Sequence, residues 1–168
     1  NPDLYEKSGL FDVCSVVPGV AAQTGIEAFE VIKSAAECEK PDLLIVVDAL
    51  AARETERLAR NVQISSTGIS PGSGIGGAHP EISLESIGIP VISIGVPTVV
   101  ETSTLVYDAM IRGGSDENTA SGLAQKTGGL FVSPKEIDVI SKNLANIIGC
   151  AVNHAFQDGL SYEEMLLL

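Results

Sequence analysis

The sequence contains no tryptophan, and aromatic residues make up only 4% of its 168 residues. Without aromatic side chains on which bases could stack, we expect no platform for single-stranded nucleic acid. Basic residues are also scarce, because Lys and Arg total 10 against 22 Asp and Glu, for a net charge of -12. Such a surface repels phosphate backbones and attracts basic protein partners. We therefore expect no direct nucleic-acid partner.

Cysteine is sparse as well. The three cysteines, Cys14, Cys38 and Cys150, are scattered and odd in number, which indicates free thiols, packed in the interior, in a reducing compartment. No apolar run approaches the roughly 20 residues of a membrane span, and no signal-peptide pattern is present. These absences predict a cytoplasmic protein that does not enter a membrane.

Hydrophobic residues are plentiful by contrast, at 45% of the chain, and the mean hydropathy is +0.27. This composition excludes a disordered polar chain and predicts a compact domain with a core of its own. We expect one domain over residues 1–168, incomplete at its amino terminus, since the chain begins at Asn1 without an initiator methionine.

Strand-like and helix-like segments alternate along the chain. A capping box at Thr24–Glu27 and a Ser-Pro-Lys-Glu start at Ser133 mark two helices, and Pro97-Thr98 is expected to end a strand and open a third. The predicted strands are 11–17, 42–48, 61–65 and 89–96; the predicted helices are 24–38, 98–112, 133–156 and short turns at 53–60, 83–86 and 161–164, with a polar linker at 113–129. This order predicts an α/β three-layer sandwich with a mostly parallel central sheet.

Asp48 is the leading candidate for chemistry. It closes the apolar run that begins at Asp42, and open α/β sheets place their sites outside the carboxyl ends of such strands. Its apolar neighbours would desolvate the carboxyl and raise its pKa into the range of a general acid. The alternative, with roughly equal weight from position alone, is an N-cap for a short following helix.

The glycine-rich segment 67–77 is expected to line a cleft. Its five glycines let the backbone approach a substrate chain closely, and Thr67 and Ser73 offer hydroxyls that could support a site. Phosphate binding through backbone N–H groups is an alternative, but the segment lacks the Lys-Ser/Thr ending of a P-loop.

Two further side chains are candidates, each with a simpler alternative. Arg53 is the arginine nearest to Asp48 and could hold a substrate carboxylate, or it could lie on a solvated helix face. His79 follows the glycine-rich segment beside Glu81 and could act as a base or a metal ligand. No second His or Cys stands at metal-ligand spacing, so we expect no metal cofactor. A serine triad is not expected either, because no Gly-x-Ser-x-Gly elbow exists.

Several segments resemble the germination proteases of spore-forming bacteria. The most specific are Val46-Val-Asp-Ala-Leu-Ala-Ala-Arg53 and the glycine-rich run 62–76, followed by Gly88-Ile-Pro-Val-Ile-Ser-Ile-Gly-Val-Pro-Thr-Val-Val100. Shorter matches at 18–20, 24–27 and 132–138 occur in the same order. The resemblance covers most of this chain and corresponds to the carboxyl-terminal portion of that family.

The resemblance implies an endopeptidase that degrades small acid-soluble, DNA-protecting spore proteins in the spore core during germination. It also implies a zymogen, a homotetramer, and a fold related to the hydrogenase-maturation peptidases and described as phosphorylase-like. The mechanism it implies is an atypical aspartic-type one with two aspartates, of which the Asp-Ala-Leu-Ala motif supplies Asp48. The related maturation peptidases hold a metal with a His beside two acids, so a metal at His79 and Asp48 is an alternative.

The second aspartate of the family lies upstream, in a segment of the type Pro-Asp-Ala-Leu-Gly-Pro. The chain contains Pro2-Asp3-Leu4 and Pro41-Asp42-Leu43, but neither continues in that way. We therefore expect that the partner acid lies outside this chain, and that the isolated chain is an inactive fragment. The alternative function is a non-catalytic binding or assembly fragment of the same protease.

Overall fold

A computed structural model describes residues 11–72, 79–156 and 163 of the chain. The chain divides into two compact units, one formed by Val16–Ile137 and the other by the described parts of Asn1–Ser15 and Asp138–Leu168. The larger unit contains the β-sheet and every candidate site residue in the described chain.

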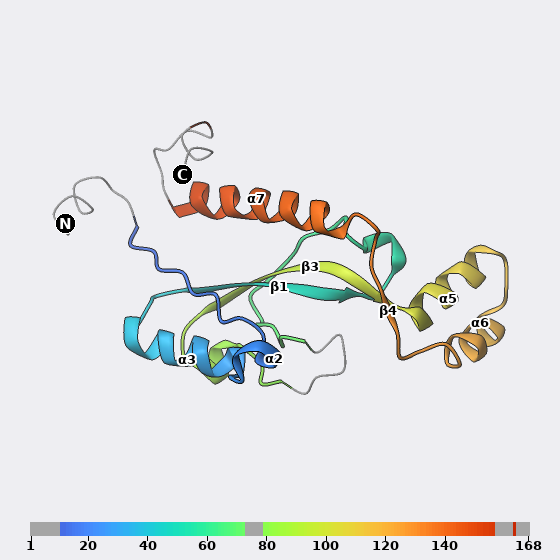
Figure 1. The fold of residues 1–168 in the computed structure, drawn as a ribbon, viewed down its shortest axis with the longest axis horizontal. Coiled ribbons are helices and arrows are strands. Elements are labelled where there is room, and N and C mark those ends of the chain that lie inside the picture. Colours follow the sequence, from blue (N-terminus) through green and yellow to red (C-terminus); the bar gives the residue numbers. More distant parts are fainter. Residues whose placement is uncertain (1–10, 73–78, 157–162, 164–168) are drawn as a thin grey trace. The chain divides into compact units, whose positions relative to one another are not determined.

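The sheet of the larger unit is centred on β3 (Val91–Glu101). β1 (Leu44–Ala52) pairs with β3 in parallel (Figure 1), whereas β2 (Gln63–Ser65) and β4 (Phe131–Val132) pair with it antiparallel. The α/β class is confirmed, but the sheet that the structure describes is mixed rather than mostly parallel. Only ten residues separate β1 from β2, which is shorter than the dozen or more that a parallel crossover requires.

Helix α3 (Ala28–Glu39) covers one face of this sheet (Figure 1). Its side chains Phe29 and Ile32 pack against the core cluster, which consists of Val46, Ile69, Ile82 and Val91. Burial of these apolar side chains stabilises the unit.

The predicted capping box at the start of α3 is wrong. Thr24 ends a separate short helix, α2 (Ala21–Thr24), and Gly25 terminates that helix in the left-handed conformation with a φ of 71°. The cap position of α3 is Glu27, whose side chain makes no capping hydrogen bond. The left-handed turn is why the two helices do not merge, since a glycine adopts it without steric cost.

Pro97 does not end the central strand, contrary to expectation. Leu50 of β1 pairs with Pro97 and the next residue, Ala51, pairs with Val99, so Thr98 is an extra residue in the ladder. A bulge tolerates a proline because one ladder hydrogen bond is already missing there. β3 therefore runs on to Glu101, and α5 (Thr102–Arg112) begins only after it.

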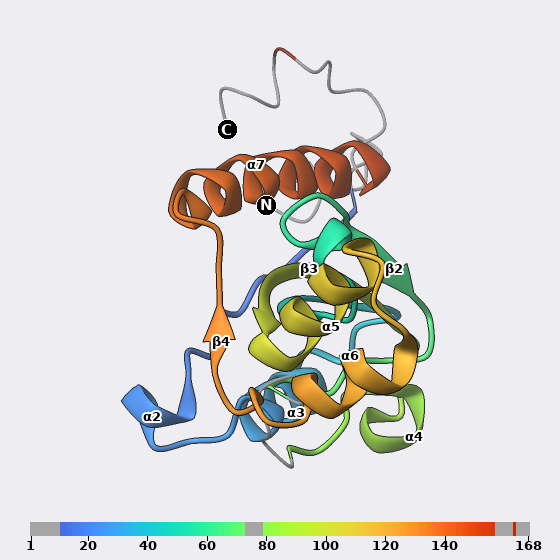
Figure 2. The ribbon, with the colours of Figure 1, turned by 90° about the vertical axis from the view of Figure 1, so that its right-hand side faces the viewer.

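The segment 113–129 is not simply a polar linker, because it contains α6 (Glu117–Ala124). Asp116 caps this helix, accepting hydrogen bonds from Thr119 N at 3.0 Å and Thr119 Oγ1 at 2.7 Å. α6 lies beside α5 (Figure 2) and buries Ala120 and Ala124.

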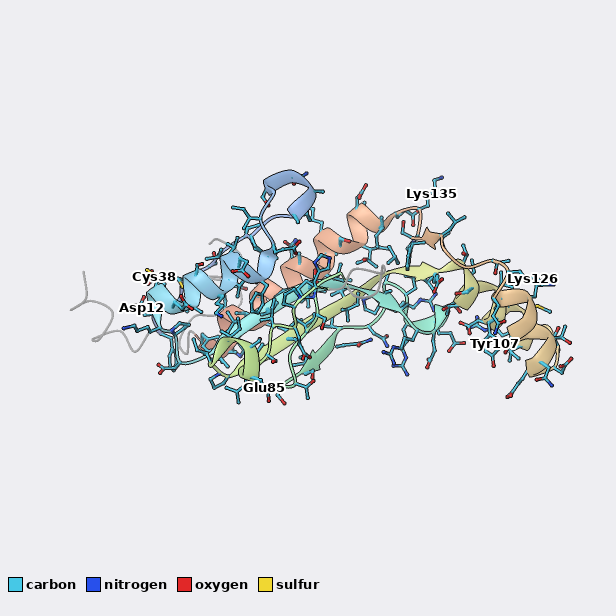
Figure 3. All side chains as sticks on the ribbon, turned by 90° about the horizontal axis from the view of Figure 1, so that it is seen from below. Asp12, Cys38, Glu85, Tyr107, Lys126 and Lys135 are labelled. Atoms are coloured by element: carbon cyan, nitrogen blue, oxygen red, sulfur yellow. The ribbon has the colours of Figure 1, made fainter. Side chains whose placement is uncertain are left out.

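The two ends of the sheet carry different helices. Cys38 of α3 and Glu85 of α4 (Leu84–Ile87) lie at one end, and Tyr107 of α5 and Lys126 lie at the other (Figure 3). The short turn predicted at 83–86 is thus confirmed as α4, and the half-exposed strand predicted at 61–65 is confirmed as β2. The helical turn predicted at 53–60 is a single 3-10 turn, η1 (Thr55–Arg57).

The smaller unit is built on α7 (Ile137–Phe156). The helix begins four residues after Ser133, because a turn closed by Ile137 N and Pro134 O precedes it. The strand predicted at 11–17 is wrong, since the structure shows irregular chain there, and the Phe11 ring packs edge-on against Phe156. The helical turn predicted at 161–164 lies outside the described residues, apart from residue 163.

Two properties concern the whole described chain. None of its helices is both long enough and apolar enough to cross a membrane. Cys14 and Cys38 are exposed and Cys150 is half-buried, so the expectation that all three thiols are interior packing groups is wrong for the first two.

Candidate active site

Asp48 lies inside β1 rather than at its end. The strand continues through Ala52 because the small apolar residues that follow Asp48 pair in register with residues 96–100 of β3. No helix starts immediately after Asp48, and its carboxylate accepts no hydrogen bond from a helix terminus. The alternative interpretation of Asp48 as an N-cap is therefore wrong.

The side chain of Asp48 emerges on the covered face of the sheet. Side chains alternate along a strand, so Asp48 shares its face with Val46, a member of the core cluster, and with Leu50, which packs against that cluster. The residue is half-buried. Burial raises the pKa of the Asp48 carboxyl above its ordinary value of 3.8, and the hydrogen bond from Ala49 N opposes this effect.

The Asp48 carboxylate also reaches the outer edge of β1. Leu44 N donates to Pro90 O of the segment leading into β3, so the backbone groups of the even-numbered residues face β3 and those of Ile45, Val47 and Ala49 face outward. Asp48 Oδ1 accepts the outward Ala49 N–H at 2.8 Å. Among the described strands, only β3 pairs with β1, and Asp48 Oδ2 has no hydrogen-bonding partner in the described chain.

The strand register defines the neighbours of Asp48 across the sheet. Asp48 is paired with Gly95 of β3, which is paired in turn with Gln63 of β2. The adjacent row is Val46, Ser93 and Ser65, in which the buried Ser93 hydroxyl lies 3.3 Å from Ser65 O and 3.1 Å from Gly68 O. The sequence alone does not identify Gln63 and Gly95 as neighbours of Asp48, because only the strand register brings them beside it.

The hydroxyl candidates lie away from Asp48. Thr67 is exposed beyond the end of β2, where its Oγ1 lies 2.7 Å from Ser65 Oγ. Because β2 runs antiparallel to β3, Thr67 continues toward the Val91 end of the sheet, away from the row of Asp48. Ser73 lies outside the described residues.

Arg53 follows the last residue of β1 and is exposed. It lies five positions after Asp48 along extended chain, which is a span of about 16 Å at roughly 3.3 Å per residue. It makes no ion pair with any side chain in the described parts of the chain, whereas Arg57 pairs with Glu54 at 3.0 Å. The geometry does not bring Arg53 to Asp48.

His79 pairs with Glu27 rather than with the neighbouring Glu81. His79 Nδ1 lies 2.8 Å from Glu27 Oε2, and both side chains are partly exposed, at 35% and 46%. The contact joins the residue that precedes α3 to the end of the glycine-rich segment. Within residues 11–72 and 79–156, no three His, Cys, Asp or Glu side chains gather in a way that could hold a metal ion.

A separate small hollow lies between η1 and α5. Its lining residues are Glu54, Glu56, Asp108, Ile111 and Arg112. Arg112 pairs with Glu56 at 3.0 Å, and Asp108 accepts a hydrogen bond from Thr55 N at 2.8 Å. These carboxylates are occupied by contacts that join η1 to α5, so the hollow is not a second carboxylate site for Asp48.

The matching family model and the similar proteins named below are all germination proteases. The germination protease family model matches residues 4–111. The chain is 41% identical to a germination protease of Clostridium perfringens over 98% of its own length and 58% of that protein, and 40% identical to one of Caldanaerobacter subterraneus over 91% and 55%. It is 50% identical to a germination protease of a Geobacillus species over 65% of its own length and 29% of that protein.

The chain thus spans a little over half the length of the Clostridium and Caldanaerobacter relatives. The family match extends over well over half of this chain and includes β1 with Asp48, β2, the glycine-rich segment and β3. On this evidence the chain belongs to the germination protease family.

Proposed function

We propose that the protein to which this chain corresponds is an endopeptidase that degrades small acid-soluble spore proteins, and that Asp48 is one of its two catalytic aspartates. The observation that supports this most directly is the state of the Asp48 carboxyl. It is half-buried, its pKa is raised by burial, and one of its oxygens has no hydrogen-bonding partner in the described chain. A carboxyl with these properties can donate a proton to a group that is brought to its second oxygen.

In the proposed reaction, two carboxyl groups share one proton, because like charges at close range cannot both be ionised. The ionised carboxylate takes a proton from a water molecule as the water oxygen attacks the peptide carbonyl. The protonated carboxyl donates its proton to the leaving amine as the C–N bond breaks. A carboxyl with a raised pKa suits the second role, and we assign that role to Asp48.

Because no second carboxylate lies beside Asp48 in the described residues, we propose that the partner acid approaches it from outside this chain. Asp42 is the nearest other aspartate in sequence to β1, but it is exposed and precedes the strand by two residues. The outer edge of β1 is where Asp48 Oδ1 lies, and at this edge the backbone groups of Ile45 and Val47 pair with no other described strand. We propose that part of the longer relatives not represented here adds to this edge and carries the second aspartate.

Several finer properties remain part of the same proposal. They are synthesis as a zymogen, assembly as a homotetramer, action in the spore core, an aspartic-type mechanism without a metal, and a complete fold that is a three-layer sandwich like that of the hydrogenase-maturation peptidases. The second candidate function is a non-catalytic binding or assembly module. The lack of a second carboxylate beside Asp48 in the described chain favours it for the isolated chain.

The test is cleavage of a purified small acid-soluble spore protein. We expect the 168-residue chain to be inactive, and the longer protein to be active. In the longer protein, Asp48→Asn should lower kcat by about 10²- to 10⁴-fold, the range typical of a lost general acid. Asp42→Asn is the matched control, since Asp42 is exposed, and it should leave kcat unchanged. Full activity of the Asp48→Asn protein would exclude the proposed role.

A further inference from the structure

Leu50 occupies an unusual place beside Asp48. It lies two residues further along β1, on the same covered face, and its own partner across the ladder is Pro97. Its side chain nevertheless extends toward the row formed by Asp48 and Gly95, two residues back along the strand. A Cβ atom added to Gly95 would lie 2.2 Å from Leu50 Cδ1 and 2.8 Å from Leu50 Cγ. The Leu50 methyl therefore occupies the place that a side chain at position 95 would take.

That place is the position next to Asp48 on the sheet. Gly95 is the register partner of Asp48, and the Cβ atoms of directly paired residues lie about 5 Å apart. The absence of a side chain at Gly95 leaves a gap between Asp48 and Gln63, and Leu50 fills it with apolar atoms.

We propose that Leu50, lying over Gly95, is a positioning residue that shields the Asp48 carboxyl from water. The inference rests on the proposed function only in treating Asp48 as the acid of the site. Mechanistically, an apolar neighbour favours the protonated form of a carboxyl, which is the form that donates a proton to a leaving group.

No described charge competes with this explanation. Across the ladder, Asp48 meets Gly95 and then Gln63, neither of which is charged. From α3, the side chains that pack on this face are Phe29 and Ile32. No Lys, Arg or His in the described chain forms an ion pair with Asp48. Exclusion of water is the remaining local cause, and Leu50 supplies the apolar atoms on the β3 side.

The experiment follows the side-chain carboxyl ¹³C signal of Asp48 by NMR during a pH titration of the 168-residue chain, with the signal assigned from Asp48→Asn. We expect Leu50→Ala to shift the titration midpoint to lower pH. Leu50→Val should do the same if the alanine variant folds poorly, because its side chain ends one carbon short of Gly95 and suits a strand. An unchanged midpoint in both variants would overturn the proposal.

Two further variants separate shielding from general loosening of the core. Leu44→Ala is the matched control, since Leu44 is on the same strand and face and packs against the same core cluster, four residues before Asp48. It should leave the midpoint unchanged, and a shift equal to that of Leu50→Ala would contradict the proposal. Adding Gly95→Ala to Leu50→Ala returns a methyl group to the same place, so the midpoint should move back toward higher pH.

These measurements need no peptidase activity. If Asp48 proves not to be catalytic, the midpoint shifts still report whether Leu50 shields it. If the shifts are absent while the longer protein loses activity with Asp48→Asn, the proposed function stands and the role of Leu50 does not.

Discussion

Asp108 of α5 accepts a hydrogen bond of 2.8 Å from the backbone N–H of Thr55, the first residue of η1. The two residues are 53 positions apart, so the contact is tertiary. It supplies an acceptor to a helix start whose own cap residue, Glu54, provides none. Arg112, one turn further along α5, reinforces it by donating to Thr55 Oγ1 at 3.0 Å. η1, which follows the strand of Asp48, is thereby fixed to α5.

We predict that Asp108→Ala lowers the free energy of unfolding by about 1–2 kcal/mol, the usual cost of removing a capping carboxylate. The reason is that the half-buried Thr55 N–H loses its acceptor. Urea denaturation measures the change. Asp42→Ala is the control, because Asp42 is exposed and should change stability by less than about 0.5 kcal/mol. Equal effects of the two substitutions would show that the Asp108 contact contributes nothing.

A second prediction is that alanine substitutions at two glycines change the stability of the protein in opposite directions. Gly68 has a φ of 100°, and a Cβ atom there would lie 2.5 Å from Ile82 O. Gly68→Ala should therefore lower the free energy of unfolding by about 2–4 kcal/mol, through backbone strain and overlap. Gly122 lies inside α6 with open space around it, so Gly122→Ala should raise stability by about 0.5–1 kcal/mol. Thermal unfolding distinguishes these opposite signs.

The sequence predicts the two long strands but not where they end. β1 and β3 are recognisable from their apolar, β-branched runs. Both extend about four residues further than the pattern indicates, β1 through the small residues up to Ala52 and β3 past Pro97. Each extension depends on the other, because the bulge at Thr98 is what allows Pro97 to remain within a paired strand. Because this dependence links residues of two different strands, no local sequence pattern predicts where either strand ends.

The sequence of helix α6 contains a helix-start signal, although its small, polar composition is typical of a linker. The segment 113–129 is small and polar, but Asp116 and Thr119 form a capping pair, and Ala120 and Ala124 are spaced for one face of a helix.

The surroundings of Asp48 are a different case. Gly95 lies 47 residues further along the chain, and only the parallel register brings it beside Asp48. The sequence can therefore nominate Asp48 as a candidate, but it does not identify the neighbours of Asp48 across the sheet.

The third prediction concerns metal binding at His79. Its Nδ1 is engaged by Glu27 Oε2 at 2.8 Å, and no described cluster of three ligands includes it. We expect His79→Ala to leave the zinc, nickel and manganese content of the longer protein unchanged, as measured by elemental mass spectrometry. Because the pair is partly exposed, the substitution should lower the free energy of unfolding by less than about 1 kcal/mol. Metal that is stoichiometric in the wild type and lost in His79→Ala would contradict the metal-free mechanism.

The last prediction follows from the raised pKa of Asp48. Burial places the folded-state pKa of this carboxyl above the ordinary value of 3.8, so between the two values the folded protein binds more protons than the unfolded protein. The contribution of Asp48 to stability is therefore fully present below about pH 3.8 and is lost as the pH rises through the folded-state pKa. At neutral pH the ionised, half-buried carboxylate destabilises the fold.

Asp48→Asn should consequently raise the thermal unfolding midpoint at pH 7, because the amide is uncharged and its oxygen still accepts the Ala49 N–H. The gain should shrink as the pH falls and vanish below about pH 3.8, where the wild-type carboxyl is protonated in both states. Calorimetry at several pH values measures it. Asp116→Asn should behave in the opposite way, because hydrogen bonds from Thr119 lower the pKa of Asp116. A neutral-pH loss of stability in Asp48→Asn would mean that the carboxylate is a structural anchor, which would remove the physical reason for assigning it the acid role.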